Sequence, residues 1–194
     1  MTKEKTSWTP SPEDNLLGLT DKDKINELEA KGIANAEFHI FNLDENIELS
    51  APLVLQFHKI AFGELYDWAG KWRTTIVTVG QIEPPDPSQI PNLIYQYFDD
   101  LNYKVFHSKA KADHIQTLAY GHYEFVRIHP FNNGNGRTGR LVMNLIALKF
   151  GYRPMELYYR EGELRSKYIE ALRLVDKGNL DPLKTLIESE LTIF

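Results

Sequence analysis

The segment from Gly136 to Phe150 contains a run of apolar side chains that would surround a helix on every side. These side chains are Leu141, Val142, Met143, Leu145, Ile146, Ala147 and Leu148. A helix that is hydrophobic all round must be buried, so other elements have to pack around it. Hydrophobic residues make up 42% of the 194 residues, which is enough for one such core. We therefore expect a single, mainly α-helical domain built around this segment.

Helical periodicity elsewhere predicts partners for this central helix. The predicted helices span 21–36, 51–62 (after an N-cap at Ser50), 88–105, 112–127, 161–175 and 182–191. We interpret the apolar stretch Phe38–Leu43 as a connector. The β-branched residues of Thr74–Val79 predict a strand, and the prolines within Glu83–Pro87 predict an exposed loop after it. The expected architecture is thus a helical body with one small β element.

Charge and composition exclude several classes of function. The formal net charge of −5 argues against bulk nucleic-acid binding, because phosphate backbones require a basic face. The chain has no cysteine, so disulfides, thiolate metal sites and cysteine nucleophiles are excluded. The first residues, MTKEKTSW, lack the apolar core of a signal peptide, and no apolar run approaches membrane-spanning length. We expect a cytoplasmic protein without a membrane or nucleic-acid partner.

The candidate chemistry lies in the segment that opens the central helix, HPFNNGNGRTGR at 129–140. Gly134 and Gly136 bracket Asn135, which lets the backbone turn tightly and approach a ligand closely. The helix that follows presents free N–H groups and the positive end of its dipole. Such a helix N-terminus is suited to binding an anion, and a phosphate above all.

Two arginines and a histidine extend this phosphate cradle. Arg137 and Arg140 are three residues apart, so they share a helix face and can clamp phosphate oxygens. His129 directly precedes the cradle, and the ordinary pKa of histidine, about 6.5, makes it a proton acceptor near neutral pH. Together these groups predict phosphoryl-type transfer to a hydroxyl, a reaction catalysed mainly by positioning and charge stabilisation.

Other interpretations of the same residues are weaker. Gly134–Gly139 matches GxGxxG, but a dinucleotide-binding fold needs a preceding strand, and the residues before His129 continue a helical stripe. A P-loop is excluded because no Gly-Lys-Ser/Thr is present. His107, His114 and His122 precede His129 at spacings of seven or eight, about 10 Å apart on a helix, which is too far to share one metal ion. The plainest alternative is a glycine-rich helix N-terminus with a buried histidine.

The segment resembles the motif of the Fic (filamentation induced by cAMP) family, HxFx(D/E)GNGRxxR, and departs from it at one position. Upstream, LYDWAGKWR at 65–73 is similar to the family's AG-x-x-R element. The resemblance covers roughly residues 49–152 and implies a mainly α, compact Fic-type helical domain with a small β-hairpin flap. We expect residues 1–48 to form an N-terminal arm and helix with a regulatory role, and residues 49–194 to form the Fic domain with its C-terminal helices.

The resemblance implies transfer of AMP from ATP, usually with Mg²⁺, to a Ser, Thr or Tyr hydroxyl of a target protein. Carried over by position, His129 would deprotonate that hydroxyl, and Phe131 would anchor the loop in the core. The nucleotide and its phosphates would be held by Gly134, Asn135, Gly136, Arg137 and Arg140. A flap would clamp the target segment as an added strand, through Thr75, Ile76, Val77, Thr78, Val79 and Gly80.

Asn133 is the departure, because the family has Asp or Glu there and uses that carboxylate to hold Mg²⁺. An amide oxygen brings no charge, so we expect weaker metal binding at Asn133. Since His129 and both arginines are retained, we expect an active protein adenylyltransferase. The alternatives are a catalytically weakened nucleotide-binding module, or transfer of another phosphate-containing group such as UMP or phosphocholine. Gly134 and Gly136 favour AMP, because the resemblance associates Ala or Lys there with other transfers.

Many members of the family carry an inhibitory helix with the pattern (S/T)xxxE(G/N), whose glutamate pairs with the second motif arginine. Glu29 is the nearest candidate here, but Ile25 and Ala30 stand at the flanking positions of the pattern. Pairing of Glu29 with Arg140 is therefore the hypothesis for inhibition in cis, and an antitoxin-like inhibitor protein is the alternative in trans. Neither the target protein nor the oligomeric state follows from the sequence.

Overall fold

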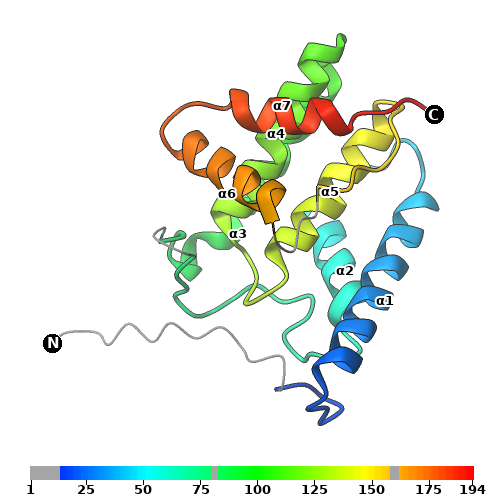
Figure 1. Cartoon of the computed structure of the whole chain (residues 1–194), viewed down its shortest axis with the longest axis vertical. Helices are drawn as coiled ribbons and strands as arrows, with labels where there is room; N and C mark the ends of the chain where they lie inside the picture. Colours follow the sequence, from blue (N-terminus) through cyan, green and yellow to red (C-terminus); the bar gives the residue numbers. More distant parts are fainter. Residues whose placement is uncertain (1–13, 80–82, 158–161) are drawn as a thin grey trace, which may run out of the picture.

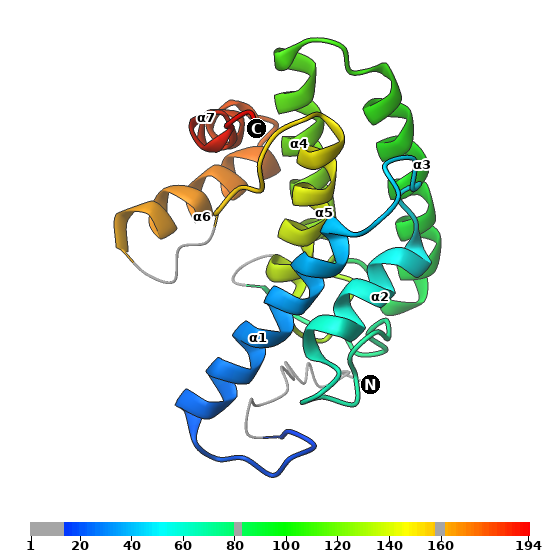
Figure 2. The same cartoon turned by 90° about the vertical axis from the view of Figure 1, so that its right-hand side faces the viewer.

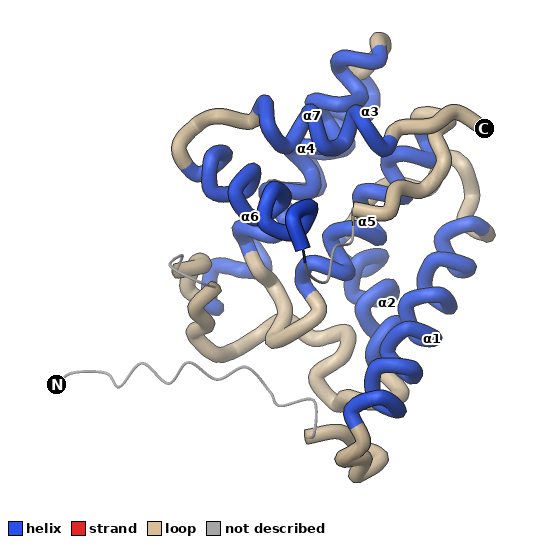
Figure 3. The backbone as a smooth tube through the Cα atoms, in the orientation of Figure 1, coloured by secondary structure: helices blue, strands red, loops and turns tan. Residues whose placement is uncertain are grey.

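Helices account for nearly all regular structure in the computed structural model, which describes residues 14–79, 83–157 and 162–194 (Figures 1 and 3). The helices of these residues are α1 (Lys22–Phe41), α2 (Ala51–Phe62), a 3₁₀ turn η1 (Pro87–Gln89), α3 (Ile90–His107), α4 (Lys111–Ile128), α5 (Asn135–Lys149), α6 (Gly162–Asp176) and α7 (Asp181–Glu190). Each helix predicted from periodicity is present, with ends that differ by a few residues.

Helix α5 is the centre of the packing, as its apolar sequence predicts. It packs against α4 and is also in contact with α1 and α2, while α3 and α7 pack on α4 (Figures 1 and 2). Met143, Ile146 and Ala147 are fully buried within α5. Because α5 is enclosed by its neighbours, the loop at its N-terminus is attached directly to the close-packed core.

Helix α1 is longer than predicted and lies close against α2. It continues to Phe41, so most of the predicted connector Phe38–Leu43 is helical, and the side chain of Ile40 is buried in this extension. The close approach occurs at Gly32, where an added Cβ would overlap the carbonyl oxygen of Ala61 on α2. This contact holds α1 on the side of α2 from which Asn26, Glu29 and Glu37 line the same cavity as the loop that opens α5.

The strand predicted over Thr74–Val79 is not formed in the described residues, where this segment is a loop apart from one bridge residue, Val79 (Figure 3). An isolated β-rich segment is marginal without neighbouring strands, and the described part of the chain contains no sheet that this segment could join. Both ends of the loop are held by the Arg73 guanidinium instead, which donates to the carbonyls of Thr75 at 2.9 Å and Pro85 at 2.6 Å. Gly80, the last predicted flap residue, lies outside the described residues.

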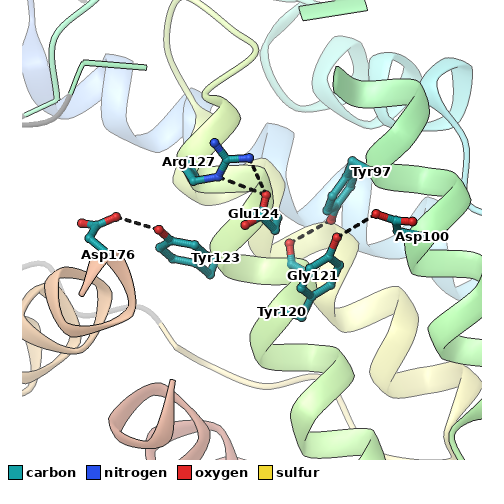
Figure 4. A network of polar contacts seen from close by, with 8 residues as sticks. All are labelled: Tyr97, Asp100, Tyr120, Gly121, Tyr123, Glu124, Arg127 and Asp176. Atoms are coloured by element: carbon teal, nitrogen blue, oxygen red, sulfur yellow. Dashed lines mark hydrogen bonds and ion pairs between the residues drawn. The ribbon is translucent and has the colours of Figure 1, made fainter. Parts of the chain in front are cut away.

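Tyrosine hydroxyls tie α4 to the helices on either side of it (Figure 4). Tyr97 on α3 donates to the carbonyl of Gly121 at 2.9 Å, and Tyr123 donates to Asp176 at the end of α6 at 2.7 Å. These bonds fix the C-terminal half of α4, from which the motif loop emerges. Among the described residues, no helix combines the length and the apolar character that crossing a membrane would require.

Candidate active site

A cleft of about 1110 Å³ opens between α1, the start of α5 and the loop that follows Arg73. The predicted site residues that line it are His129, Asn133, Gly134, Asn135, Gly136, Arg137, Arg140, Glu29, Val77, Thr78 and Val79. Thr75 and Ile76 are not part of the lining: the Thr75 hydroxyl donates to Asn132 at 3.3 Å, and Ile76 is half exposed. The fold thus gathers the motif, part of the predicted flap and the candidate inhibitory residue around one cavity.

His129 stands where α4 ends, in a left-handed backbone conformation with φ 51° and ψ 58°. It is the one residue other than glycine with positive φ in the described parts of the chain, and such strain persists only where the surroundings enforce it. The ring Nδ1 lies 3.3 Å from the Val126 carbonyl, which can only accept, so Nδ1 carries the proton and Nε2 has a free lone pair. Burial lowers the pKa of His129 to about 4, opposed by the Val126 bond and reinforced by the Arg73 charge. The imidazole is therefore neutral near pH 7.

The buried side chain of Arg73 enforces this turn. Its Nε donates to the His129 carbonyl at 2.7 Å, and its backbone N–H donates to the Pro130 carbonyl at 2.9 Å. The Thr75 and Pro85 carbonyls accept from the other end of the same guanidinium. A buried guanidinium is costly unless its N–H groups are satisfied, and here backbone carbonyls satisfy it. Arg73 thereby joins the base of the predicted flap to the backbone of His129.

The N-terminus of α5 forms the predicted anion cradle. Gly134 is the N-cap, with φ 77°, and a Cβ there would lie 2.6 Å from Phe62 Cε2, so only glycine fits. The first intrahelical bond runs from the Thr138 N–H to the Gly134 carbonyl. The N–H groups of residues 135–137 precede it and have no intrahelical partner by helix geometry, which leaves them for a ligand.

The side chain of Asn135 forms its hydrogen bonds within the motif loop. The side chain is buried and bonds the backbone of Phe131 twice, accepting from its N–H and donating to its carbonyl, both at 2.8 Å. This pair closes the loop around the buried Phe131 ring. The polar atoms of Asn135 are therefore used to shape the cradle, and a ligand would meet the backbone.

The two motif arginines differ in their surroundings. Arg137 forms an ion pair with Glu29 on α1 at 2.6 Å, and its guanidinium lies 4.4 Å from the centre of the Phe62 ring. The Tyr66 hydroxyl donates to the other oxygen of Glu29 at 2.9 Å. The hypothesis that paired Glu29 with Arg140 is thus corrected, because the ion pair formed by Glu29 is with the first motif arginine. Arg140 lies one helical turn further along and lines the same cleft.

Asn133 offers little to a metal ion. Its Oδ1 accepts from the N–H of the next residue, Gly134, at 2.7 Å. In the described residues no group of three or more His, Cys, Asp or Glu side chains could hold a metal. Mg²⁺ prefers carboxylate and phosphate oxygens, so the neutral, hydrogen-bonded amide oxygen does not fit a protein-held Mg²⁺.

Sequence reasoning assigned no role to four residues that shape the site: His58, Phe62, Tyr66 and Arg73. Arg73 is the arginine of the upstream AG-x-x-R element, so the resemblance could have indicated its importance for the site. His58 lies on the apolar face of α2 together with Val54 and Ala61, and a lone histidine on such a face could have been noticed. Phe62 and Tyr66 look like ordinary core residues in the sequence, and only their neighbours in space reveal their contacts with Arg137 and Glu29.

Comparison with known proteins agrees with this geometry. Protein adenylyltransferase fic-1 of Caenorhabditis briggsae is 36% identical over 139 residues, which is 71% of this chain and 26% of the relative. Protein adenylyltransferase Fic of Drosophila persimilis is 33% identical over 147 residues, covering 75% of this chain and 28% of the relative. The chain therefore spans about a quarter of the length of these curated relatives.

Solved structures share the fold. Fic-1 (residues 134–508) of C. elegans superposes with a TM-score of 0.72 at 28% identity, over 88% of this chain and 49% of that one. BepC of Bartonella tribocorum, solved with bound AMPPNP, gives a TM-score of 0.76 at 20% identity, over 100% of this chain and 96% of that one. The family model described as Fic/DOC matches residues 48–147, which span the upstream element and the whole motif loop. The chain belongs to the Fic/DOC family.

Proposed function

We propose that this protein transfers AMP from ATP to a hydroxyl side chain of a target protein, with His129 as the general base. The observation that carries the proposal is the gathering of a neutral histidine, an open helix N-terminus and two arginines around one cleft. The names of the curated relatives, protein adenylyltransferases, support AMP transfer in particular. BepC, solved with AMPPNP bound, supports a triphosphate as the ligand of such a cleft.

In the proposed reaction, the hydroxyl oxygen of the target attacks the α-phosphorus of ATP. His129 Nε2 accepts the hydroxyl proton, and the bond from the α-phosphorus to the oxygen that bridges it to the β-phosphorus breaks. The products are a protein–AMP phosphodiester, pyrophosphate and a protonated His129 that returns its proton to solvent. The N–H groups at the start of α5 and the two arginines stabilise the negative charge on the phosphates.

The flap residues Val77, Thr78 and Val79 line the cleft beside His129 and are proposed to hold the target segment. An extended segment could pair with the backbone of this loop, as peptides do when they add to a strand edge. Arg73 would then keep the docked hydroxyl in register with His129, because it bonds to both the flap base and the His129 backbone.

Glu29 is proposed to restrain the site in cis. Its carboxylate occupies the Arg137 guanidinium, which therefore is not available to a phosphate in this arrangement. Nucleotide binding would require the ion pair to open, at a cost set by its partly buried position and by the Tyr66 bond. The alternative proposal is that a separate antitoxin-like protein inhibits the enzyme in trans by binding at the same cleft.

The test is incubation of the purified protein with α-³²P-ATP and Mg²⁺ or Mn²⁺, alone and with a cell lysate. The expected result is label on the protein itself or on a lysate protein, absent with γ-³²P-ATP and absent in His129→Ala. Parallel incubations with α-³²P-UTP and α-³²P-GTP report the choice of nucleotide.

A different outcome would favour a nucleotide-binding module that has lost turnover, the candidate supported by Asn133. In that case the wild-type protein would bind AMPPNP in a calorimeter, but no label would appear with either metal, even in a Glu29→Gly variant. Label that persists in His129→Ala would contradict the assignment of the base.

A further inference from the structure

His58 on α2 is buried against the motif loop and takes no part in the transfer described above. Its side chain is fully buried; Nδ1 accepts from the Gly70 N–H at 2.8 Å, and Nε2 lies 3.1 Å from the Asn133 carbonyl. Because an amide N–H can only donate and a carbonyl can only accept, the ring is neutral and carries its proton on Nε2. Burial lowers the pKa of His58 to about 3, with the nearby Arg137 charge acting in the same direction.

Aromatic neighbours hold this ring in one orientation. It stacks on Phe131, with centroids 3.6 Å apart and planes 7° from parallel. Phe62 and Trp68 lie at 5.0 and 5.5 Å on other sides of the ring. A ring packed in this way cannot turn, so its Nε2–H stays directed at the Asn133 carbonyl.

The Asn133 carbonyl and the Gly134 N–H belong to one planar trans peptide, in which the two bonds point in opposite directions. His58 draws the carbonyl into the core, so the N–H of the same unit is turned the other way. There it meets Asn133 Oδ1 at 2.7 Å, at the N-terminus of α5 and among the residues that line the cleft. The direction of one cradle N–H thus depends on a hydrogen bond made behind the loop.

We propose that His58 is a positioning residue, which aims the Gly134 N–H at a phosphate of the bound nucleotide. The inference rests on the proposed function, since it places a nucleotide in this cradle. On binding, a phosphate oxygen replaces Asn133 Oδ1 as the acceptor of that N–H. His58 itself never touches the nucleotide. Its loss therefore weakens binding of the nucleotide in the ground state and in the transition state alike, which raises KM and leaves kcat nearly unchanged.

Two amide variants isolate the bond to Asn133. Gln can accept from the Gly70 N–H and donate to the Asn133 carbonyl, as histidine does, whereas Asn keeps the acceptor for Gly70 and is too short to reach Asn133. We expect His58→Asn to raise the Kd for AMPPNP and the KM for ATP about tenfold, with kcat within about threefold of wild type, and His58→Gln to stay within about threefold throughout. His114→Gln is the matched control, because His114 is also stacked on a ring and hydrogen-bonded, to Phe150 and Tyr152, outside the cleft.

A measurement on the wild-type protein tests the same geometry without any variant. In ¹H–¹⁵N spectra, the Gly134 amide should shift strongly on addition of AMPPNP. The inference is overturned if the chemical shift of the Gly134 amide stays the same while AMPPNP binds. It is also overturned if both His58 variants bind AMPPNP with the Kd of the wild type, or if both raise this Kd equally and in proportion to the fall of their melting temperatures. Wild-type protein that binds AMPPNP but transfers no label refutes the proposed function and leaves the binding comparison valid. Absence of AMPPNP binding both in the wild type and in Glu29→Gln, which removes the proposed restraint, refutes both.

Discussion

Single residues of the motif loop act mainly through the backbone. His129 is held in a left-handed turn by Arg73, and Asn135 turns its side chain inward to bond the Phe131 backbone. Gly134 is required by its positive φ and by the Phe62 ring beside it. In the proposed reaction, the direct chemical contributions come from the His129 ring and the arginine side chains. A substitution in this loop should therefore be judged first by which backbone bond it removes.

Asn133→Asp tests what the amide at the family's carboxylate position does. A carboxylate adds a negative charge that favours a hard divalent cation, so the metal concentration for half-maximal labelling should fall, by about tenfold. The measurement is labelling with α-³²P-ATP over a Mg²⁺ titration. Asn132→Asp, one residue earlier, is the matched control for added charge. An unchanged titration would show that position 133 does not influence the metal.

Among the helices, α1 is the one that forms a wall of the cleft and carries Glu29. It brings Glu29 onto Arg137, and it can do so because Gly32 lets it approach α2 closely. Helix α2 supports the other side of the same arrangement with the Phe62 ring under Arg137. The close packing of α1 against α2 therefore also fixes the position of the Glu29–Arg137 ion pair.

Glu29→Gln should increase labelling, because it removes the charge that occupies Arg137. A partly buried ion pair of this kind opposes phosphate binding by about 1–2 kcal/mol, so the KM for ATP should fall by about five- to thirtyfold. Glu27→Gln, on an exposed position of the same helix, is the matched control and should leave KM unchanged. If Glu29→Gln labels no faster than wild type at any ATP concentration, Glu29 does not restrain the site.

Gly32→Ala should separate α1 from α2. The new Cβ would overlap a backbone carbonyl that cannot move alone, so the variant should be less stable by about 1–3 kcal/mol, despite the higher helix propensity of Ala. Urea denaturation measures the loss, and Lys31→Ala at the exposed neighbouring position is the control. A variant as stable as wild type would show that the crossing is looser than the contact with Ala61 implies.

The whole molecule buries several histidines in neutral form around α5. Burial is the main cause that lowers the pKa of His58 to about 3, and of His122 and His129 to about 4. In the unfolded chain these rings take up protons near pH 6.5, whereas in the folded protein they do so only at much lower pH. Protonation therefore favours the unfolded state throughout the interval between those values.

The stability of the protein should consequently be full above pH 7 and fall as the pH drops from about 6.5 toward 4. Near pH 5 each of the three histidines contributes a slope of up to about 1.4 kcal/mol per pH unit. Urea midpoints at pH 7, 6 and 5 measure the decline, and His122→Gln should reduce its slope by about a third. A midpoint that stays constant from pH 7 to pH 5 would contradict the neutral burial of these rings.

Local sequence patterns predicted the helices and the central position of α5, which the structure confirms, and they marked the motif loop as the candidate site. Apolar periodicity is a local property, so it predicts each helix and its buried face without knowledge of the neighbours. The glycines, arginines and histidine of residues 129–140 are likewise adjacent in the chain, and their order predicts a phosphate cradle with a base beside it. These predictions needed no contact between distant segments.

The contacts that hold the motif loop, and the ion pair that Arg137 forms, became visible only in the tertiary structure. The pairs Glu29–Arg137, His58–Asn133 and Arg73–His129 join residues far apart in sequence, and no local pattern encodes which partner each side chain meets. The predicted strand at Thr74–Val79 was wrong for the same reason, because β propensity becomes a strand only where a neighbouring strand is present to pair with it. Which side chains meet in these pairs depends on how distant segments, such as α1 and α2, pack around the start of α5, and this packing exists only in the folded protein.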